Sequence, residues 1–151
     1  MSTLSERFER VQGETLEHEG QTVRQLYRRT VSDGERFTVE LRDKAGRKVQ
    51  ALNLDADGGA ALVINEEEVS RAVLRADTAP GRTEVVVTAD GSGELTAYNA
   101  WIGSHDALHS WIGNSGMLVE DDGETVTLRC SDGDGDPSFD DLVVVLRFEQ
   151  D

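Results

Sequence analysis

The stretch that decides the fold is "RRTVSDGERFTVEL", residues 28–41, in which Asp33-Gly34 separates two segments of strand-forming residues. Asp-Gly supplies the positive φ angles that tight turns require. After the turn, Phe37, Val39 and Leu41 alternate with polar residues, as in a half-buried strand. We therefore expect two antiparallel strands around this turn, in a chain built mainly from strands.

The same turn signal recurs at Asp57-Gly58, Asp90-Gly91 and Asp122-Gly123, each between segments rich in Val, Thr, Leu and Tyr. We interpret each as a hairpin. Strands at this spacing, without helix–strand alternation, predict an all-β fold: an antiparallel, jelly-roll-like β-sandwich, with a closed antiparallel β-barrel as the alternative. About nine strands are expected, at 22–31, 36–42, 47–54, 60–64, 83–89, 94–101, 116–120, 125–130 and 141–149.

Two segments depart from the strand pattern. In "NEEEVSRAVLRA", residues 65–76, Asn65 as N-cap and glutamates in the first turn predict one short helix. Residues 1–20 fit either a peripheral helix or an edge strand. The length suits one domain over 1–151. Strand alternation predicts a core of Phe37, Val39, Leu41, Leu52, Leu62, Ile64, Val85, Val87, Leu118, Val126, Leu128, Leu142, Val144 and Leu146.

Charge and composition exclude several classes of protein. The formal net charge is −15, from 30 acidic and 15 basic residues, which disfavours nucleic acid and anionic membranes as partners. The single cysteine, Cys130, excludes an internal disulfide and a Cys-rich zinc site. The N-terminus is polar, and no apolar run approaches the ~20 residues of a membrane span. We therefore expect a cytoplasmic protein.

The most acidic stretch is "CSDGDGDPSFDDL", residues 130–142. Its carboxylates largely alternate with small residues, so that a curled loop can turn several of them inward, and Ca²⁺ prefers such oxygen ligands. Their mutual repulsion would be offset by a divalent cation. The alternative is an acidic turn that keeps a sheet edge soluble. An EF-hand is excluded because Pro137 and Val143 stand where glycine and glutamate are required. The candidate ligands are Asp132, Asp134, Asp136, Asp140 and Asp141.

The segment "GDGDPSFDDLVVVLRF", residues 133–148, resembles the G-D-x-D-F-N-D-L-V motif near the end of some bacterial calcium-binding β-sandwich domains. In this chain Pro137 and Ser138 are inserted before the phenylalanine, and Asp140 replaces asparagine. The resemblance implies a calcium ion at the start of the terminal strand. The matching residues are Gly133, Asp134, Asp136, Phe139, Asp141, Leu142 and Val143.

A second candidate site is "AYNAWIGSHDALHSWIGNSGM", residues 97–117, which holds both tryptophans and two of the three histidines. Aromatic surfaces with a few hydrogen-bonding groups are typical of ligand pockets. The alternative is tryptophans in the core and histidines in a solvated loop. On a helix, His105 and His109 could chelate a metal, but H-D-A-L-H is not the H-E-x-x-H of zinc proteases. The candidate ligand-binding residues are Tyr98, Asn99, Trp101, His105, His109, Trp111 and Asn114.

Three functional hypotheses follow. The first is a non-enzymatic Ca²⁺-binding β-sandwich module that binds a small molecule, a carbohydrate or a protein through the aromatic segment. The second is a small cofactor-independent biosynthetic enzyme of isomerase or cyclase type, with Tyr98 and either His105 or His109 as an acid–base pair. The third is an acidic immunity or inhibitor protein that neutralises a basic partner through residues 120–141.

Overall fold

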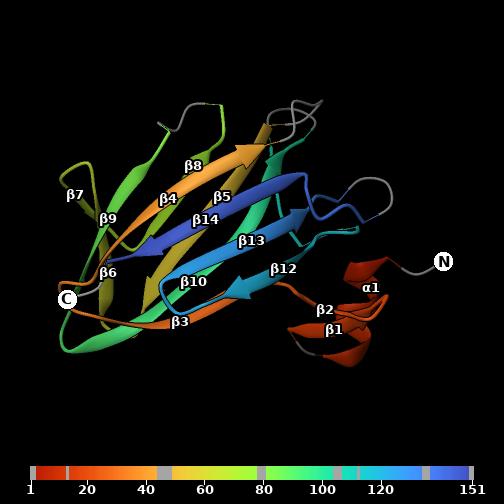
Figure 1. Ribbon diagram of the computed structural model, residues 1–151, viewed down its shortest axis with the longest axis horizontal. Helices are drawn as coiled ribbons and strands as arrows, with labels where there is room; N and C mark the ends of the chain where they lie inside the picture. Colours follow the sequence, from red (N-terminus) through yellow and green to blue (C-terminus); the bar gives the residue numbers. More distant parts are fainter. Residues whose placement is uncertain are drawn as a thin grey trace.

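The computed structural model describes residues 3–12, 14–43, 49–77, 81–103, 107–111, 113–133 and 137–149. The fold is mostly β, with 64% of the described residues in strands, and its two antiparallel sheets pack as a sandwich with one short helix at one end (Figure 1). The predicted all-β sandwich is confirmed. The closed-barrel alternative is wrong, because the sheets of the described residues do not close. None of the described helices is long and apolar enough to cross a membrane.

The larger sheet, sheet A, has the order β1-β2-β12-β13-β14-β4-β9-β6-β7, and sheet B has the order β11-β10-β5-β8 with β3 also paired to β10. The described residues form more strands than the nine expected, because short strands border both sheets and because the strand expected at 22–31 is divided into β2 and β3, which belong to different sheets. The elements of sheet A are β1 (Thr15–His18), β2 (Gln21–Arg24), β4 (Arg36–Asp43), β6 (Ala60–Ile64), β7 (Glu67–Val69), β9 (Thr83–Ala89), β12 (Gly116–Asp121), β13 (Thr125–Ser131) and β14 (Leu142–Phe148). Those of sheet B are β3 (Tyr27–Ser32), β5 (Val49–Asp57), β8 (Arg71–Arg75), β10 (Ser92–Ile102) and β11 (Leu108–His109).

The Asp-Gly dipeptides turn the chain as expected, but only one of them closes a hairpin. The glycine φ angles are 84° at Gly34, 68° at Gly58, 89° at Gly91 and 94° at Gly123. Gly123 joins the paired strands β12 and β13. The other three join β3 to β4, β5 to β6 and β9 to β10, and each of these pairs is divided between sheets A and B. The three expected hairpins are therefore corners at which the chain changes sheet.

The helix predicted over residues 65–76 is wrong. Asn65 and Glu66 adopt positive φ angles of 53° and 68° and form the turn between β6 and β7 instead of a helix cap. The following strand β8 pairs with β5, and within it the half-buried Ala72 and Leu74 alternate with exposed residues. A period of two, not of 3.6, therefore governs this segment.

The N-terminal segment contains both of the alternatives expected from the sequence, a helix and an edge strand. Helix α1 (Leu4–Val11) begins with a capping box, in which the Thr3 hydroxyl accepts a hydrogen bond from the Glu6 amide at 3.2 Å and the Glu6 carboxylate accepts one from the Thr3 amide at 3.3 Å. α1 lies beside β1 and β2 at one end of the molecule (Figure 1). Leu4 and Phe8 of α1 form a small core with neighbouring strand residues.

The main core lies between the two sheets and matches most of the predicted set. Leu41 and Ile64 are only half-buried, at the margins of this core. Leu118 is also half-buried, but it packs against the small core around Leu4 and Phe8 instead. The remaining predicted core residues are buried: Phe37, Val39, Leu52, Leu62, Val85, Val87, Val126, Leu128, Leu142, Val144 and Leu146. These side chains fix the distance between the sheets, and so the positions of the loops at either end.

A substitution at Gly93 would test how closely β10 approaches the Asp57-Gly58 corner. A Cβ at Gly93 would overlap the Cβ of Ala60 and lie 2.6 Å from the Asp57 carbonyl oxygen. Gly93→Ala is expected to lower the free energy of unfolding by about 1–3 kcal/mol in urea denaturation. Gly81→Ala is the control, since no heavy atom lies within 4 Å of a Cβ added there, and its effect should stay within about 0.5 kcal/mol. Equal effects would contradict the close approach of β10 to this corner.

Candidate functional site

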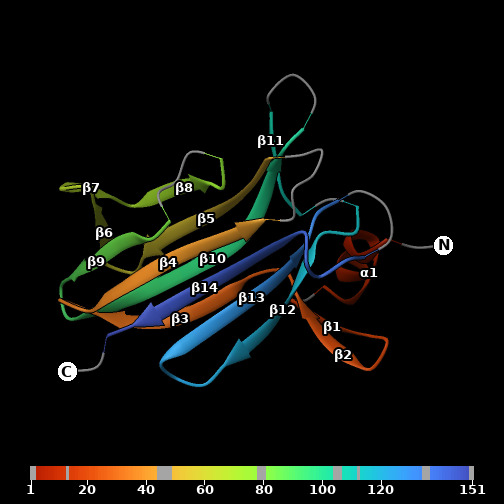
Figure 2. The same cartoon turned by 45° about the horizontal axis from the view of Figure 1, so that its top comes forward.

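The two segments singled out in the sequence meet at one end of the sandwich. The end of β4, the start of β5, and the ends of β10 and β13 lie together there (Figure 2). The strand registers agree, because Ile102 pairs with Val49 and Cys130 pairs with Leu142. The acidic loop after β13 therefore lies beside residues of β5 and β10.

Two buried amide side chains of sheet B hold the start of the acidic loop. Gln50 Nε2 donates a hydrogen bond to Asp132 Oδ2 at 3.1 Å. Asn99 Nδ2 donates to the Ser131 carbonyl at 3.0 Å. Gln50 is 4% exposed, Asn99 0% and Asp132 9%. These bonds cross the interior from one sheet to the other, so the start of the loop, at Ser131 and Asp132, is anchored in the protein.

The described part of the loop is also closed on itself. The Asp132 amide donates to Asp141 Oδ2 at 3.0 Å, which brings the two ends of the loop together. The Ser138 amide donates to Ser131 Oγ at 3.2 Å, and the Ser138 hydroxyl donates to the carboxylate of the exposed Asp140. Two of the predicted metal ligands, Asp132 and Asp141, are therefore adjacent.

Three buried side-chain atoms have no hydrogen-bond partner among the described residues: Gln50 Oε1, Asn99 Oδ1 and Ser115 Oγ. Leaving a buried acceptor unpaired costs about 1–3 kcal/mol, so such atoms are rare in native proteins unless a water or an ion meets them. Two of the three belong to the amides that hold the acidic loop. Amide oxygens are Ca²⁺ ligands, and the sequence pattern of carboxylates did not reveal them.

The carboxylates of the described residues do not form a cation cage by themselves. No group of three or more His, Cys, Asp or Glu side chains within the described ranges is placed to hold a metal. Asp134 and Asp136, both predicted ligands, lie outside the described residues. The oxygen set at this end is therefore mixed, with carboxylates from the loop and amides from sheet B.

The aromatic segment is divided by strand β10 between two faces of sheet B. Successive residues of a strand point to opposite faces, so Asn99 and Trp101 face the interior while Tyr98 faces outward. Trp101 is 2% exposed, and its cross-strand partners are Gln50 and His109. The Trp101 and His109 ring centroids are 6.4 Å apart. Trp101 therefore lies beside Gln50, one of the two buried amides that hold the acidic loop.

Trp111 lies on the outer side and covers Tyr98. Their ring centroids are 4.2 Å apart, and Trp111 is 39% exposed. The Trp111 indole Nε1 donates to the Gln25 carbonyl at 3.0 Å, and its own carbonyl accepts from the Ser5 hydroxyl at 3.1 Å. Asn114 Oδ1 accepts from the Leu4 amide at 3.1 Å and so fixes the start of α1.

The position of Tyr98 on the outer face of sheet B bears on the enzyme hypothesis, in which Tyr98 acts with His105 or His109 as an acid–base pair. Tyr98 and His109 lie on opposite faces of sheet B, so they do not meet as a pair. His105, the other candidate, lies outside the described residues. Burial, followed by the charge of Asp55, raises the pKa of the Tyr98 hydroxyl, which therefore stays protonated at neutral pH.

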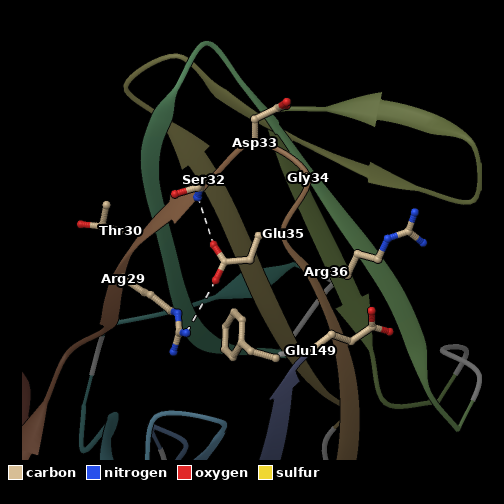
Figure 3. Close-up of a pocket in the computed structure, with 9 residues that line it drawn as sticks. Arg29, Thr30, Ser32, Asp33, Gly34, Glu35, Arg36 and Glu149 are labelled. Atoms are coloured by element: carbon tan, nitrogen blue, oxygen red, sulfur yellow. Dashed lines mark hydrogen bonds and ion pairs between the residues drawn. The ribbon is translucent and has the colours of Figure 1, made fainter. Parts of the chain in front are cut away.

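A hollow of about 810 Å³, which the sequence did not indicate, lies at the opposite end of the sandwich around the Asp33-Gly34 corner (Figure 3). The Arg29 guanidinium lies 3.6 Å from the centroid of the Phe148 ring and 3.6 Å from Glu35 Oε1. Glu35 Oε2 accepts a hydrogen bond from the Ser32 amide at 3.0 Å. Asp33 Oδ1 accepts one from the Ala89 amide at 2.9 Å. These charged groups stabilise the corner, which is a structural role.

The division of the tryptophans predicts a difference in solvent access. In Trp101→Phe, the remaining Trp111 should show fluorescence that neutral acrylamide quenches steeply. In Trp111→Phe, the remaining Trp101 should be quenched only weakly, because its side chain is buried. Acrylamide is chosen because the net charge of −15 would repel iodide. Equal quenching in the two variants would contradict the assignment of the tryptophans to opposite faces.

In comparisons with known proteins, no family model, no curated protein and no solved structure matches this chain. The function is therefore argued from the geometry of the residues themselves.

Proposed function

We propose that this protein is a calcium-binding β-sandwich module whose cation is bound where the acidic loop meets sheet B. Asp132 and Asp141 would supply carboxylate oxygens, and Gln50 and Asn99 would supply amide oxygens. The observation that carries the proposal is the pair of unpartnered, buried amide oxygens on the two side chains that hold the loop beside Asp132.

The chemistry of these groups suits calcium better than magnesium or zinc. Ca²⁺ accepts six to eight oxygen ligands in flexible geometry, from carboxylates, amide carbonyls, backbone carbonyls and water. Mg²⁺ requires a nearly ideal octahedron and usually retains several waters. Zn²⁺ prefers nitrogen and sulfur ligands, and the only cysteine, Cys130, is buried with its pKa raised by burial. Asp134 and Asp136, which lie outside the described residues, are predicted to complete the set of calcium ligands.

A cation at this position would raise the free energy of unfolding of the protein. It would link the loop between β13 and β14 in sheet A to β5 and β10 in sheet B, across the interior. It would also meet the acceptors of Gln50 and Asn99 that are otherwise unpaired. A ligand that binds only the native state raises the free energy of unfolding by RT ln(1 + [L]/Kd), or about 2.7 kcal/mol at a hundredfold excess over Kd.

The test is calorimetric titration of chelator-stripped protein with Ca²⁺, together with thermal melts. We expect saturable binding to the wild-type protein and a higher melting temperature. Asp132→Asn keeps the shape of the side chain and removes its charge. It should weaken binding by about tenfold or more, because ligand charge tunes calcium affinity. Mg²⁺ at the same concentration should give a smaller shift.

Asp90→Asn is the matched control, because Asp90 is an exposed turn carboxylate at another Asp-Gly corner. It should bind Ca²⁺ like the wild-type protein. Gln50→Leu removes an amide oxygen without changing the charge, and should also weaken binding. Absence of heat and of any thermal shift would show that water satisfies the buried oxygens and would overturn the proposal. Binding that survives both Asp132→Asn and Asp141→Asn would exclude this ligand set.

A further inference from the structure

The outer face of sheet B carries a row of side chains that the calcium site does not use. Val73 of β8 pairs with Asn53 of β5, and Asn53 pairs with Tyr98 of β10. The three side chains therefore lie side by side, across about 10 Å for three strands. Trp111 lies on the Tyr98 ring and continues the row. Trp111 is 39% exposed and Val73 41% exposed, so both ends of the row reach solvent.

The chain holds Trp111 in place despite its backbone. Its φ of 58° is uncommon for a bulky residue and costs on the order of 1–3 kcal/mol. Contacts from three separate segments of the chain compensate for this: the Tyr98 ring, the Gln25 carbonyl and the Ser5 hydroxyl. A large aromatic side chain is thus fixed at the surface, and a ligand would not need to order it.

Polar groups border this aromatic surface. Asn53 is 4% exposed, and no hydrogen bond joins its side-chain amide, or the Tyr98 hydroxyl, to another described residue. Beside them, Arg71 Nε donates to Asp55 Oδ1 at 2.9 Å. Asp55 and Arg71 are also the charged groups that act on the Tyr98 hydroxyl. Asn53 and Tyr98 are only 4% and 8% exposed, so the groups that reach solvent beside Val73 on this face are the Trp111 ring and the paired carboxylate and guanidinium of Asp55 and Arg71.

We propose that this outer face of sheet B binds a short neutral oligosaccharide. A sugar ring has an apolar face that stacks on an aromatic ring, and equatorial hydroxyls that need donors and acceptors close to the ring plane. Trp111 supplies the first and the Asp55–Arg71 pair supplies the second. Tyr98, which is only 8% exposed, supports the Trp111 ring from below. Asp55 and Arg71 balance each other in charge, and the protein carries −15, so an anionic saccharide is disfavoured.

The experiment is a titration of the full chain with cellohexaose, maltohexaose, xylohexaose, mannohexaose and chitohexaose. Trp101→Phe leaves Trp111 as the single fluorescent reporter of the outer face. At least one of these sugars should bind and change the Trp111 emission. Trp111→Ala, followed by calorimetry, should weaken that binding by about tenfold or more, from the loss of an aromatic contact. Raising the salt concentration should leave the affinity unchanged, because the ligand is neutral.

Two further variants allow the proposal to be tested even if Trp111→Ala disturbs the fold. Arg71→Ala removes a side chain that is 70% exposed, so it should weaken binding without changing the melting temperature. Val11→Ala is the control, since Val11 is an exposed hydrophobic residue of α1 that takes no part in the proposed site. It should bind as the wild-type protein does.

The proposal is overturned if none of the five sugars binds, or if binding is unchanged in both Trp111→Ala and Arg71→Ala. Self-association that is lost in Trp111→Ala, without sugar binding, would show that a second copy of the chain covers the face, and would overturn it equally. The experiment is run in chelator, where we expect binding to persist, because the two proposed sites lie on opposite faces of sheet B. Failure of the calcium proposal would therefore not affect this result.

Discussion

The sandwich depends on three Asp-Gly corners that move the chain from one sheet to the other. At Gly34, Gly58 and Gly91 the backbone adopts positive φ angles that cost glycine little. Each corner sends consecutive strands into opposite sheets, so the strands that the corners join, β3, β4, β5, β6, β9 and β10, each pair with at least one strand that is not their neighbour in sequence. The longest example is β10, which pairs with β5 over nine positions and with β3 over six. The core between the sheets can therefore form only when these non-local pairs are made, and such topologies fold slowly.

The sequence predicted local structure well and strand partners poorly, for a physical reason. Alternation of apolar and polar residues reports which side chains face the core, and it placed most of the core correctly, including Phe37, Leu128 and Leu146. The Asp-Gly signal reports only that the backbone reverses. Whether the strand that follows pairs with the preceding one or crosses to the other sheet is decided by packing between distant segments, which no local pattern contains. The false helix at 65–76 has a similar cause, because Asn65 favours a left-handed turn as readily as a helix cap.

The candidate sites show the same limit at the level of side chains. The carboxylates of the acidic loop were evident in the sequence, but the Gln50 amide that holds Asp132 comes from 82 residues earlier in the chain. Only the completed sandwich brings it there. The opposite error affected the aromatic segment, where residues close in sequence were expected to line one pocket. A strict period of two would have separated Tyr98 from Asn99 and Trp101, since they lie on one strand. Trp111 could not be placed this way, because it follows β11 in an irregular segment.

Because Asn99 and Tyr98 are neighbours on β10, the proposed calcium and saccharide sites share one strand, and their relation follows from what holds Trp111. The acidic loop does adjoin the segment after Trp111, since the Asn114 amide donates to the Gly133 carbonyl at 3.3 Å. The contacts that fix the Trp111 ring and carbonyl, however, come from Tyr98, Gln25 and Ser5. None of these belongs to the loop. A cation there would stabilise the end of the sandwich and the start of α1, through Asn114, without being needed to form the aromatic surface. This arrangement favours a stabilising cation over one that gates ligand binding, because gating requires two arrangements of Trp111 with different affinities for the ligand.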